Sequence, residues 1–142
     1  MRALSIRQPW AELILSGRKT IETRTWRTSQ RGLIAIHAGW IVDEDICALY
    51  GFDPAGLARG GLVGTVEVRG VFAFSAETWR DLRDQHCVPD EDPAGRVGWW
   101  LENPCRLGEL IPLRGLPGLF PLEPDVAARV EAGLAAKKGQ DR

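Results

Sequence analysis

The run Leu33–Ala38 constrains the fold of this chain more than any other segment, because every residue in it except His37 is apolar. A strand that carries apolar side chains on both faces must be covered on both faces. The run therefore predicts a strand buried within the protein. A long strand is also predicted at Leu62–Phe74, where valines dominate and where Gly64 and Gly70 permit bends or bulges.

Shorter segments add further strands to this pair. Alternating polar and apolar residues predict strands at Ala3–Arg7 and Lys19–Trp26. Aromatic residues predict another strand at Val97–Leu101, followed by a turn at Glu102–Pro104, and Leu110–Leu113 is one more candidate. The chain should therefore contain five or six strands.

Short helices are predicted between and after these strands. They cover Pro9–Gly17, Asp43–Tyr50, Ala76–His86 and an amphipathic segment at Asp125–Lys138. Strands separated by short helices favour an α+β fold, here a small mixed β-barrel, over a sheet of alternating strand–helix–strand units. The length of 142 residues fits a single domain over residues 1–142, with its core at about 3–115 and a C-terminal helical extension at about 123–138.

Composition disfavours several classes of protein. No segment approaches the roughly 20 apolar residues of a membrane helix, and the first residues lack the apolar part of a signal peptide. We therefore expect a cytoplasmic protein that does not bind a membrane. The three cysteines, Cys47, Cys87 and Cys105, are widely spaced and the chain has two histidines. We expect reduced thiols, no metal site and no cofactor.

Charge is distributed unevenly along the chain, although the net charge is only −1. Residues 1–31 carry seven basic and two acidic side chains, a balance of +5, whereas the remaining residues carry −6. Such asymmetry indicates an anionic ligand, with a solvated basic face as the competing interpretation. The low net charge predicts a small binding footprint with few phosphate contacts.

Glu22, Arg24 and Trp26 are spaced by two, so a strand would place them on one face. An indole can stack on a base, a guanidinium can pair with phosphate, and a carboxylate can accept from an exocyclic amine. The alternative is that the two charged residues form a surface ion pair and that Trp26 belongs to the core. Lys19 would point to the opposite face of a regular strand, so it joins this group only from the loop before the strand.

Three motifs in the first 38 residues resemble those of a known family. They are Leu-Ser-Ile-Arg-Gln-Pro-Trp-Ala at 4–11, Gly-x-Lys-Thr-x-Glu-x-Arg-x-Trp at 17–26 and Arg-Gly-x-Ile-Ala-Ile-His-Ala at 31–38. Together they resemble the ASCH domain, named for homology to activating signal cointegrator 1, over about residues 3–107. The resemblance implies a PUA-like β-barrel with a cleft beside the first helix and the second strand. Family members are associated with RNA binding, transcription coactivation and, in one bacterial branch, hydrolysis of acetylated cytidine.

The resemblance also suggests roles for individual residues. Lys19 matches the lysine that the small amidohydrolases use to activate a nucleophile, whereas Glu22 stands where those enzymes have a catalytic threonine. A carboxylate cannot replace a hydroxyl nucleophile without changing the intermediate. Lys19 and Glu22 could instead form an acid–base pair, while the amidohydrolases' later glutamate would fall near Asp90 or Glu91. The Glu-x-Arg-x-Trp version of the motif resembles the coactivator branch, which implies binding.

Other candidates each have a structural alternative. His37 is either near the cleft or a hydrogen-bonded core histidine, and Trp10 is either at an anion-binding helix start or in the core. Trp99 and Trp100 point to opposite faces of a strand, so one should be core and the other available to a ligand. The predicted RNA- or nucleotide-binding residues are Gln8, Pro9, Trp10, Lys19, Glu22, Arg24, Trp26, Arg27, His37 and Trp99.

Three functions remain open on the sequence alone. The leading hypothesis is a module that binds single-stranded RNA or a modified nucleotide in a basic, aromatic cleft. The first alternative is a small hydrolase acting on acylated nucleosides or RNA, with Lys19 and Glu22 as catalytic residues. The second alternative is a coactivator-like domain whose cleft takes a protein partner; salt-insensitive binding would favour it.

Overall fold

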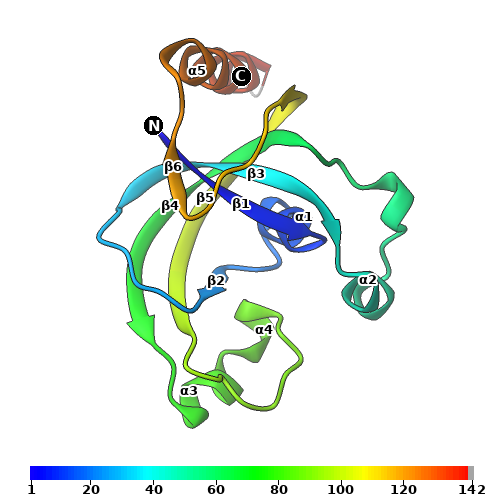
Figure 1. Ribbon diagram of the computed structural model, residues 1–142, viewed down its shortest axis with the longest axis vertical. Coiled ribbons are helices and arrows are strands. Elements are labelled where there is room, and N and C mark those ends of the chain that lie inside the picture. The colour runs from blue at the N-terminus through cyan, green and yellow to red at the C-terminus, as the bar shows by residue number, and fades with distance from the viewer. Residues whose placement is uncertain (141–142) are drawn as a thin grey trace.

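A single mixed sheet forms the body of the computed structural model, which describes residues 1–140. Within that range the sheet has six strands, in the order β2-β5-β4-β3-β1-β6. The strands are β1 (Arg2–Gln8), β2 (Ile21–Arg24), β3 (Gly32–Val42), β4 (Gly61–Ala73), β5 (Val97–Pro112) and β6 (Leu119–Pro121). Strands β1 and β3 are parallel, and the other neighbouring pairs are antiparallel. The long strands β4 and β5 bend strongly, which curves the whole sheet (Figure 1).

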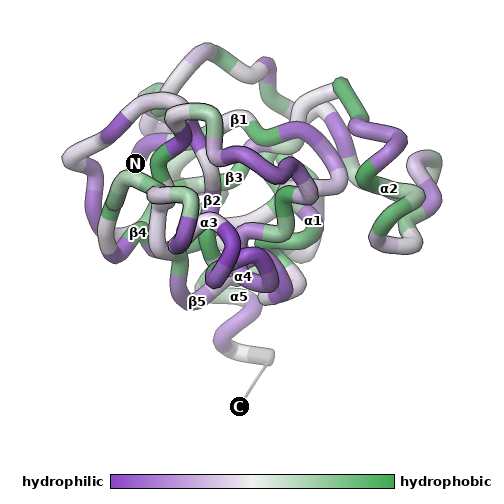
Figure 2. Tube along the Cα trace, turned by 90° about the horizontal axis from the view of Figure 1, so that it is seen from below, coloured by the Kyte–Doolittle hydropathy of each residue, from purple (hydrophilic) through white to green (hydrophobic). Residues whose placement is uncertain are grey.

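Helices occupy the inside of this curve and its two ends. They are α1 (Trp10–Leu15), α2 (Glu44–Tyr50), α3 (Ala76–Asp81), α4 (Arg83–His86) and α5 (Pro124–Gln140), with a 3₁₀ turn at Pro54–Gly56. Helix α1 lies within the curve, whereas α5 and the α3–α4 pair lie at opposite ends (Figure 1). In Figure 2, α1 is largely hydrophobic and the α3–α4 segment largely hydrophilic, as their degrees of burial require.

Two groups of apolar side chains form the core. The larger group packs α1 against the sheet and includes Ile14, Ile36 and Val66, all nearly inaccessible to solvent. The smaller group lies under α5 and includes Phe120 and Val130. Val97 and Trp99 of β5 belong to the larger group and pair with Arg24 and Glu22, so the core helps to position the short strand β2.

The structure confirms the α+β class and the buried run in β3, where Ile34–Ala38 are all buried. It has six strands where five or six were expected, but the two strands predicted at 97–101 and 110–113 are one strand, β5, and β6 was not predicted. A closed barrel is not confirmed, because β2 and β6 are the two free edges of the described sheet. No helix within residues 1–140 has both the length and the apolar character needed to cross a bilayer.

The predicted turn at Glu102–Pro104 is wrong, because β5 continues through it. Thr65 pairs with Cys105 and Glu67 pairs with Glu102, so Asn103 and Pro104 lie opposite one residue of β4. This arrangement is a β-bulge, in which a proline needs no ladder hydrogen bond of its own. Two further differences are the break between α3 and α4 at Leu82 and the short β6, which sequence periodicity did not indicate.

Candidate functional site

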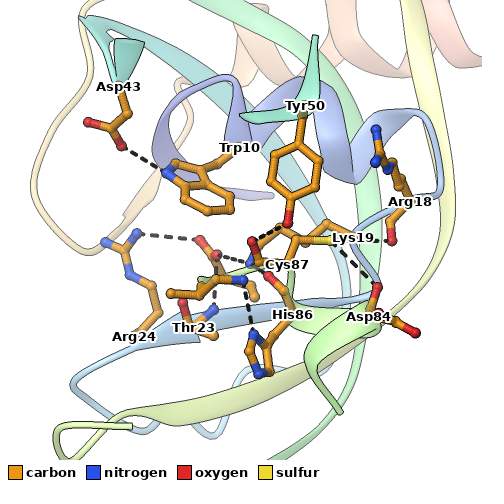
Figure 3. Close-up of polar contacts among 12 residues, drawn as sticks. Trp10, Arg18, Lys19, Thr23, Arg24, Asp43, Tyr50, Asp84, His86 and Cys87 are labelled. Carbon is orange, nitrogen blue, oxygen red and sulfur yellow. Dashed lines mark hydrogen bonds and ion pairs between the residues drawn. The ribbon is translucent and has the colours of Figure 1, made fainter. Parts of the chain in front are cut away.

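A cavity of about 710 Å³ opens beside α1 and β2 and is lined by side chains from both. Trp10 starts α1, Lys19 lies in the loop before β2, and Glu22 and Arg24 belong to β2 itself. The segment 88–96 after α4 closes another side. We call this space the Lys19 cavity; Figure 3 shows the polar groups around it. Four of the predicted binding residues therefore converge on one cavity.

Lys19 and Glu22 form a buried ion pair at the base of this cavity. The Lys19 Nζ lies 3.9 Å from Glu22 Oε1, and the two side chains are only 1% and 5% exposed. The same Nζ donates a hydrogen bond to the backbone oxygen of His86 and lies 4.9 Å from the centre of the Trp10 ring. The lysine reaches this position because it precedes the strand, as the loop interpretation required.

Burial lowers the pKa of the Lys19 ammonium below its ordinary value, since the charged form loses its hydration. The Glu22 carboxylate opposes this effect, and the nearby Arg96 guanidinium adds to it. An amine with a lowered pKa is more readily deprotonated near neutral pH than an exposed lysine is. Lys19 is therefore a candidate proton-transfer group at the base of the cavity.

Glu22 is held in place by three neighbours. Its Oε1 accepts a hydrogen bond from the backbone N–H of Thr23 at 3.0 Å, in addition to the Lys19 contact. Its Oε2 accepts from Arg24 Nη1 at 3.5 Å. Arg24 is partly exposed and lies 5.6 Å from the centre of the Trp26 ring. The carboxylate thus has a fixed orientation, while the guanidinium at its side remains accessible to a ligand.

Several cavity residues were not predicted from the sequence. Trp10 Nε1 donates to Asp43 Oδ2 at 2.8 Å, and Arg7 Nη1 lies 3.4 Å from the other oxygen of Asp43. On the opposite side Arg96 pairs with Asp90 at 2.8 Å. Within the described residues, Arg96 Nη1 is a buried nitrogen without a hydrogen-bond partner. Arg7 belongs to the basic opening segment and Asp90 to the region that the resemblance marked, whereas Arg96 had no local signal.

The cavity lining carries four cations, Arg7, Lys19, Arg24 and Arg96, and three carboxylates, Glu22, Asp43 and Asp90. It is therefore only weakly positive, with donors for an anion and acceptors for amines in one space. Residues 1–140 contain no group of three or more histidine, cysteine, aspartate or glutamate side chains placed to hold a metal ion.

Gln8 and Pro9, both predicted to bind the ligand, are buried under α1 instead. The Gln8 side chain donates to the backbone oxygen of Ala58 at 2.9 Å and accepts from the Glu12 N–H at 3.0 Å. Both polar ends of this side chain are therefore occupied by the protein, which corrects the prediction for Gln8.

Trp99 and Trp26 also lie away from the Lys19 cavity. Trp99 is fully buried in the larger core, and Trp26 packs edge-on against it with ring centres 5.0 Å apart. The sequence predicted that Glu22, Arg24 and Trp26 share one face of a strand. Trp26 does not belong to that face, because β2 stops at Arg24 and the chain then bends. Trp100 is the more exposed of the tryptophan pair, but it stacks on Phe72.

Arg27 and His37 are the remaining predicted residues, and neither lines the Lys19 cavity. Arg27 is exposed in the segment after β2. His37 is 2% exposed and is hydrogen bonded to Ser5 Oγ at 2.9 Å and to the backbone oxygen of Leu113 at 2.6 Å. The core-histidine alternative therefore describes its surroundings correctly.

Solved structures with a similar fold come from Zymomonas mobilis. The crystal structure of its ASCH protein superposes with a TM-score of 0.68 at 13% identity, covering 92% of this chain and 93% of that one. Two point mutants of the same protein each give a TM-score of 0.67 at 12% identity, covering 92% of this chain and 94% or 96% of theirs. This likeness shows that the two proteins share a fold. No curated protein matches the sequence significantly.

The sequence itself matches the model of one protein family, the ASCH domain, over residues 4–111. That range contains the first two motifs, which supply Arg7, Trp10, Lys19, Glu22 and Arg24 to the lining of the Lys19 cavity. The chain belongs to the ASCH domain family.

Proposed function

We propose that the Lys19 cavity binds one nucleotide, either within single-stranded RNA or as a modified nucleoside. The observation that carries this proposal is the convergence of Trp10, Lys19, Glu22 and Arg24 from a helix, a loop and a strand around about 710 Å³ of space. That volume is of the size that binds a small organic ligand. The family's general association with RNA supports the same ligand class.

Each group has a chemical role in this proposal. The Arg24 and Arg7 guanidiniums are the accessible cations and would pair with phosphate. Glu22 keeps acceptor capacity after its three contacts, because a carboxylate has about four lone-pair positions, and would accept from an exocyclic amine. The half-buried Trp10 ring, held by Asp43, offers a flat surface against which a base can pack.

The binding proposal is tested with Arg24→Ala and a fluorescein-labelled RNA hexamer of randomised sequence. Losing a charged hydrogen bond to phosphate costs about 1.5–3 kcal/mol, so anisotropy titration should show affinity weakened about tenfold or more. Arg80→Ala is the matched control, because Arg80 is an exposed arginine on α3 outside the cavity, and it should bind as the wild type does. Equal affinities of the two variants would remove the main support for the proposal.

A second candidate function, hydrolysis of an acylated nucleoside or of RNA, is favoured by the lowered pKa of buried Lys19 beside Glu22. A neutral amine could accept a proton from water as that water adds to an acyl carbonyl, and the pair would return the proton to the leaving group. Incubation with N4-acetylcytidine and with labelled RNA should then show turnover that Lys19→Met and Glu22→Gln abolish.

The two substitutions keep side-chain size, so thermal unfolding and hexamer binding can show that each variant is folded. If the wild type turns over neither substrate, the protein is not a hydrolase of these compounds. If turnover survives in Lys19→Met, the reaction does not use this pair.

A further inference from the structure

A second cavity, of about 680 Å³, adjoins the first at β1. It is lined by the last part of β3, by Gly60 and by the segment 113–117 that precedes β6. Ser5 and Arg7 of β1 line both cavities. We call this space the Trp40 cavity. A linear ligand in the Lys19 cavity could therefore pass Arg7 and continue into the Trp40 cavity.

Trp40 lies at this cavity with 74% of its surface exposed, the largest exposure of any big apolar side chain in the described chain. Its ring lies directly over Gly60, where an added Cβ would come within 2.4 Å of a ring carbon. Gly60 has a φ of +82°, a conformation that glycine adopts without strain. The backbone thus supports the indole while most of its surface stays open to solvent. Such a surface suits stacking by a planar ligand.

The charge of the Trp40 cavity favours an anion. Arg7 and Arg114 contribute two guanidiniums, and no aspartate or glutamate is among the described residues that line it. The Lys19 cavity, by contrast, has three carboxylates among its lining residues. A phosphate between Arg7 and Arg114 would meet no carboxylate of the cavity lining and would share Arg7 with Asp43, whose Oδ1 lies 3.4 Å from Arg7 Nη1.

The floor of the Trp40 cavity is fixed by a hydrogen-bonded network. His37 bonds to Ser5 Oγ on β1 and to the backbone oxygen of Leu113, so it joins β1, β3 and the segment 113–117. Gly115 lies so close to this network that an added Cβ would be 2.7 Å from the His37 ring. The wall that carries Arg114 is therefore held in place before a ligand binds.

We propose that the Trp40 cavity binds the neighbouring nucleotide of the same RNA strand, with its base stacked on Trp40 and its phosphate between Arg7 and Arg114. This inference rests on the proposed function of the Lys19 cavity. It narrows the ligand class from any nucleotide to a strand of at least two linked nucleotides. A free nucleoside monophosphate would fill one cavity alone and lose the second set of contacts.

The test compares Trp40→Leu with Trp40→Phe, using the randomised RNA hexamer and the four nucleoside monophosphates as probes. Stacking a base on an aromatic ring is worth about 1–3 kcal/mol, so Trp40→Leu should weaken hexamer binding roughly fivefold or more. Trp40→Phe should keep most of the affinity, because phenylalanine still presents a flat ring. Calorimetry should show that the monophosphates bind in the Lys19 cavity with the same affinity in both variants as in the wild type.

Leu49→Ala is the matched control, since Leu49 is an exposed apolar residue of α2 that lines neither cavity. It should leave hexamer affinity unchanged. If Arg24→Ala weakens hexamer binding while Trp40→Leu does not, the second subsite is wrong and the proposed function stands. If neither variant affects binding, both proposals fail. Ile41 is an exposed apolar residue that lines the same cavity. If Ile41→Ala is as damaging as Trp40→Leu and phenylalanine does not rescue, the cavity takes an apolar peptide instead of a base.

Discussion

At the residue scale, the Lys19 cavity depends on a histidine that does not line it. His86 is fully buried, and its ring stacks on Trp79 with centres 4.0 Å apart. The His86 Nε2 lies 2.7 Å from the backbone oxygen of Trp79, and Nδ1 accepts from the N–H of Val88 at 3.0 Å. These two bonds require a neutral ring with its proton on Nε2. The ring thereby orients Val88, which lines the cavity, while the His86 carbonyl holds Lys19.

This arrangement predicts that stability falls as pH drops below about 6.5. Burial lowers the pKa of His86 from its ordinary value of 6.5, and the cations Lys19, Arg83 and Arg96 add to the effect of burial, against the Trp79 carbonyl. The unfolded chain therefore takes up this proton at a higher pH than the folded chain does. Stability is fully present above pH 6.5 and declines toward the lowered folded pKa, by at most about 1.4 kcal/mol per pH unit.

Urea unfolding of the wild type and of His86→Gln between pH 5 and pH 7.5 measures this contribution. It is the difference between the two proteins in the slope of the free energy of unfolding against pH. The variant should lose the part of the pH dependence that comes from His86, whatever its absolute stability. Parallel slopes in the two proteins would show that His86 does not titrate differently on folding.

At the element scale, the sequence predicted those parts of the fold that depend on local patterns. The apolar run of β3 and the helical spacing of α1 are such patterns, and both elements lie where they were expected. The continuation of β5 through Pro104 could not be predicted, because the proline is accommodated by a bulge against β4. The break of the helix at Leu82 likewise depends on how Trp79 and His86 pack together.

The same distinction explains the predicted site. Lys19, Glu22 and Arg24 come from one continuous segment whose spacing was informative, and the structure places all three at one cavity. Trp26 and Trp99 were misplaced because the end of β2 and the depth of the core are set by contacts between distant segments. Arg96 was missed for a related reason. Only the pairing of β5 with β2 brings the segment before β5 to the cavity.

At the scale of the whole molecule, the uneven distribution of charge along the chain gathers basic side chains at one cavity. The basic opening segment supplies Arg7, Lys19 and Arg24 to one cavity, and the excess of acids elsewhere keeps the net charge at −1. A protein with so little net charge exerts little overall long-range attraction on nucleic acid. Binding must then rely on a few phosphates held at short range, together with stacking and base-edge contacts.

The final prediction concerns the salt dependence that follows from this footprint. Each phosphate of a single strand that is neutralised contributes about 0.7 to the slope of log affinity against log salt. Arg24, Arg7 and Arg114 would contact two or three phosphates, so hexamer titrations in increasing sodium chloride should give a slope of about −1.5 to −2. Arg114→Ala should make the slope shallower by about 0.7, whereas Arg129→Ala on α5, which lines neither cavity, should not change it. A slope near zero would mean that phosphate is not the ligand group, and a slope steeper than about −3 would mean that the protein contacts more of the hexamer's phosphates than these two cavities can hold.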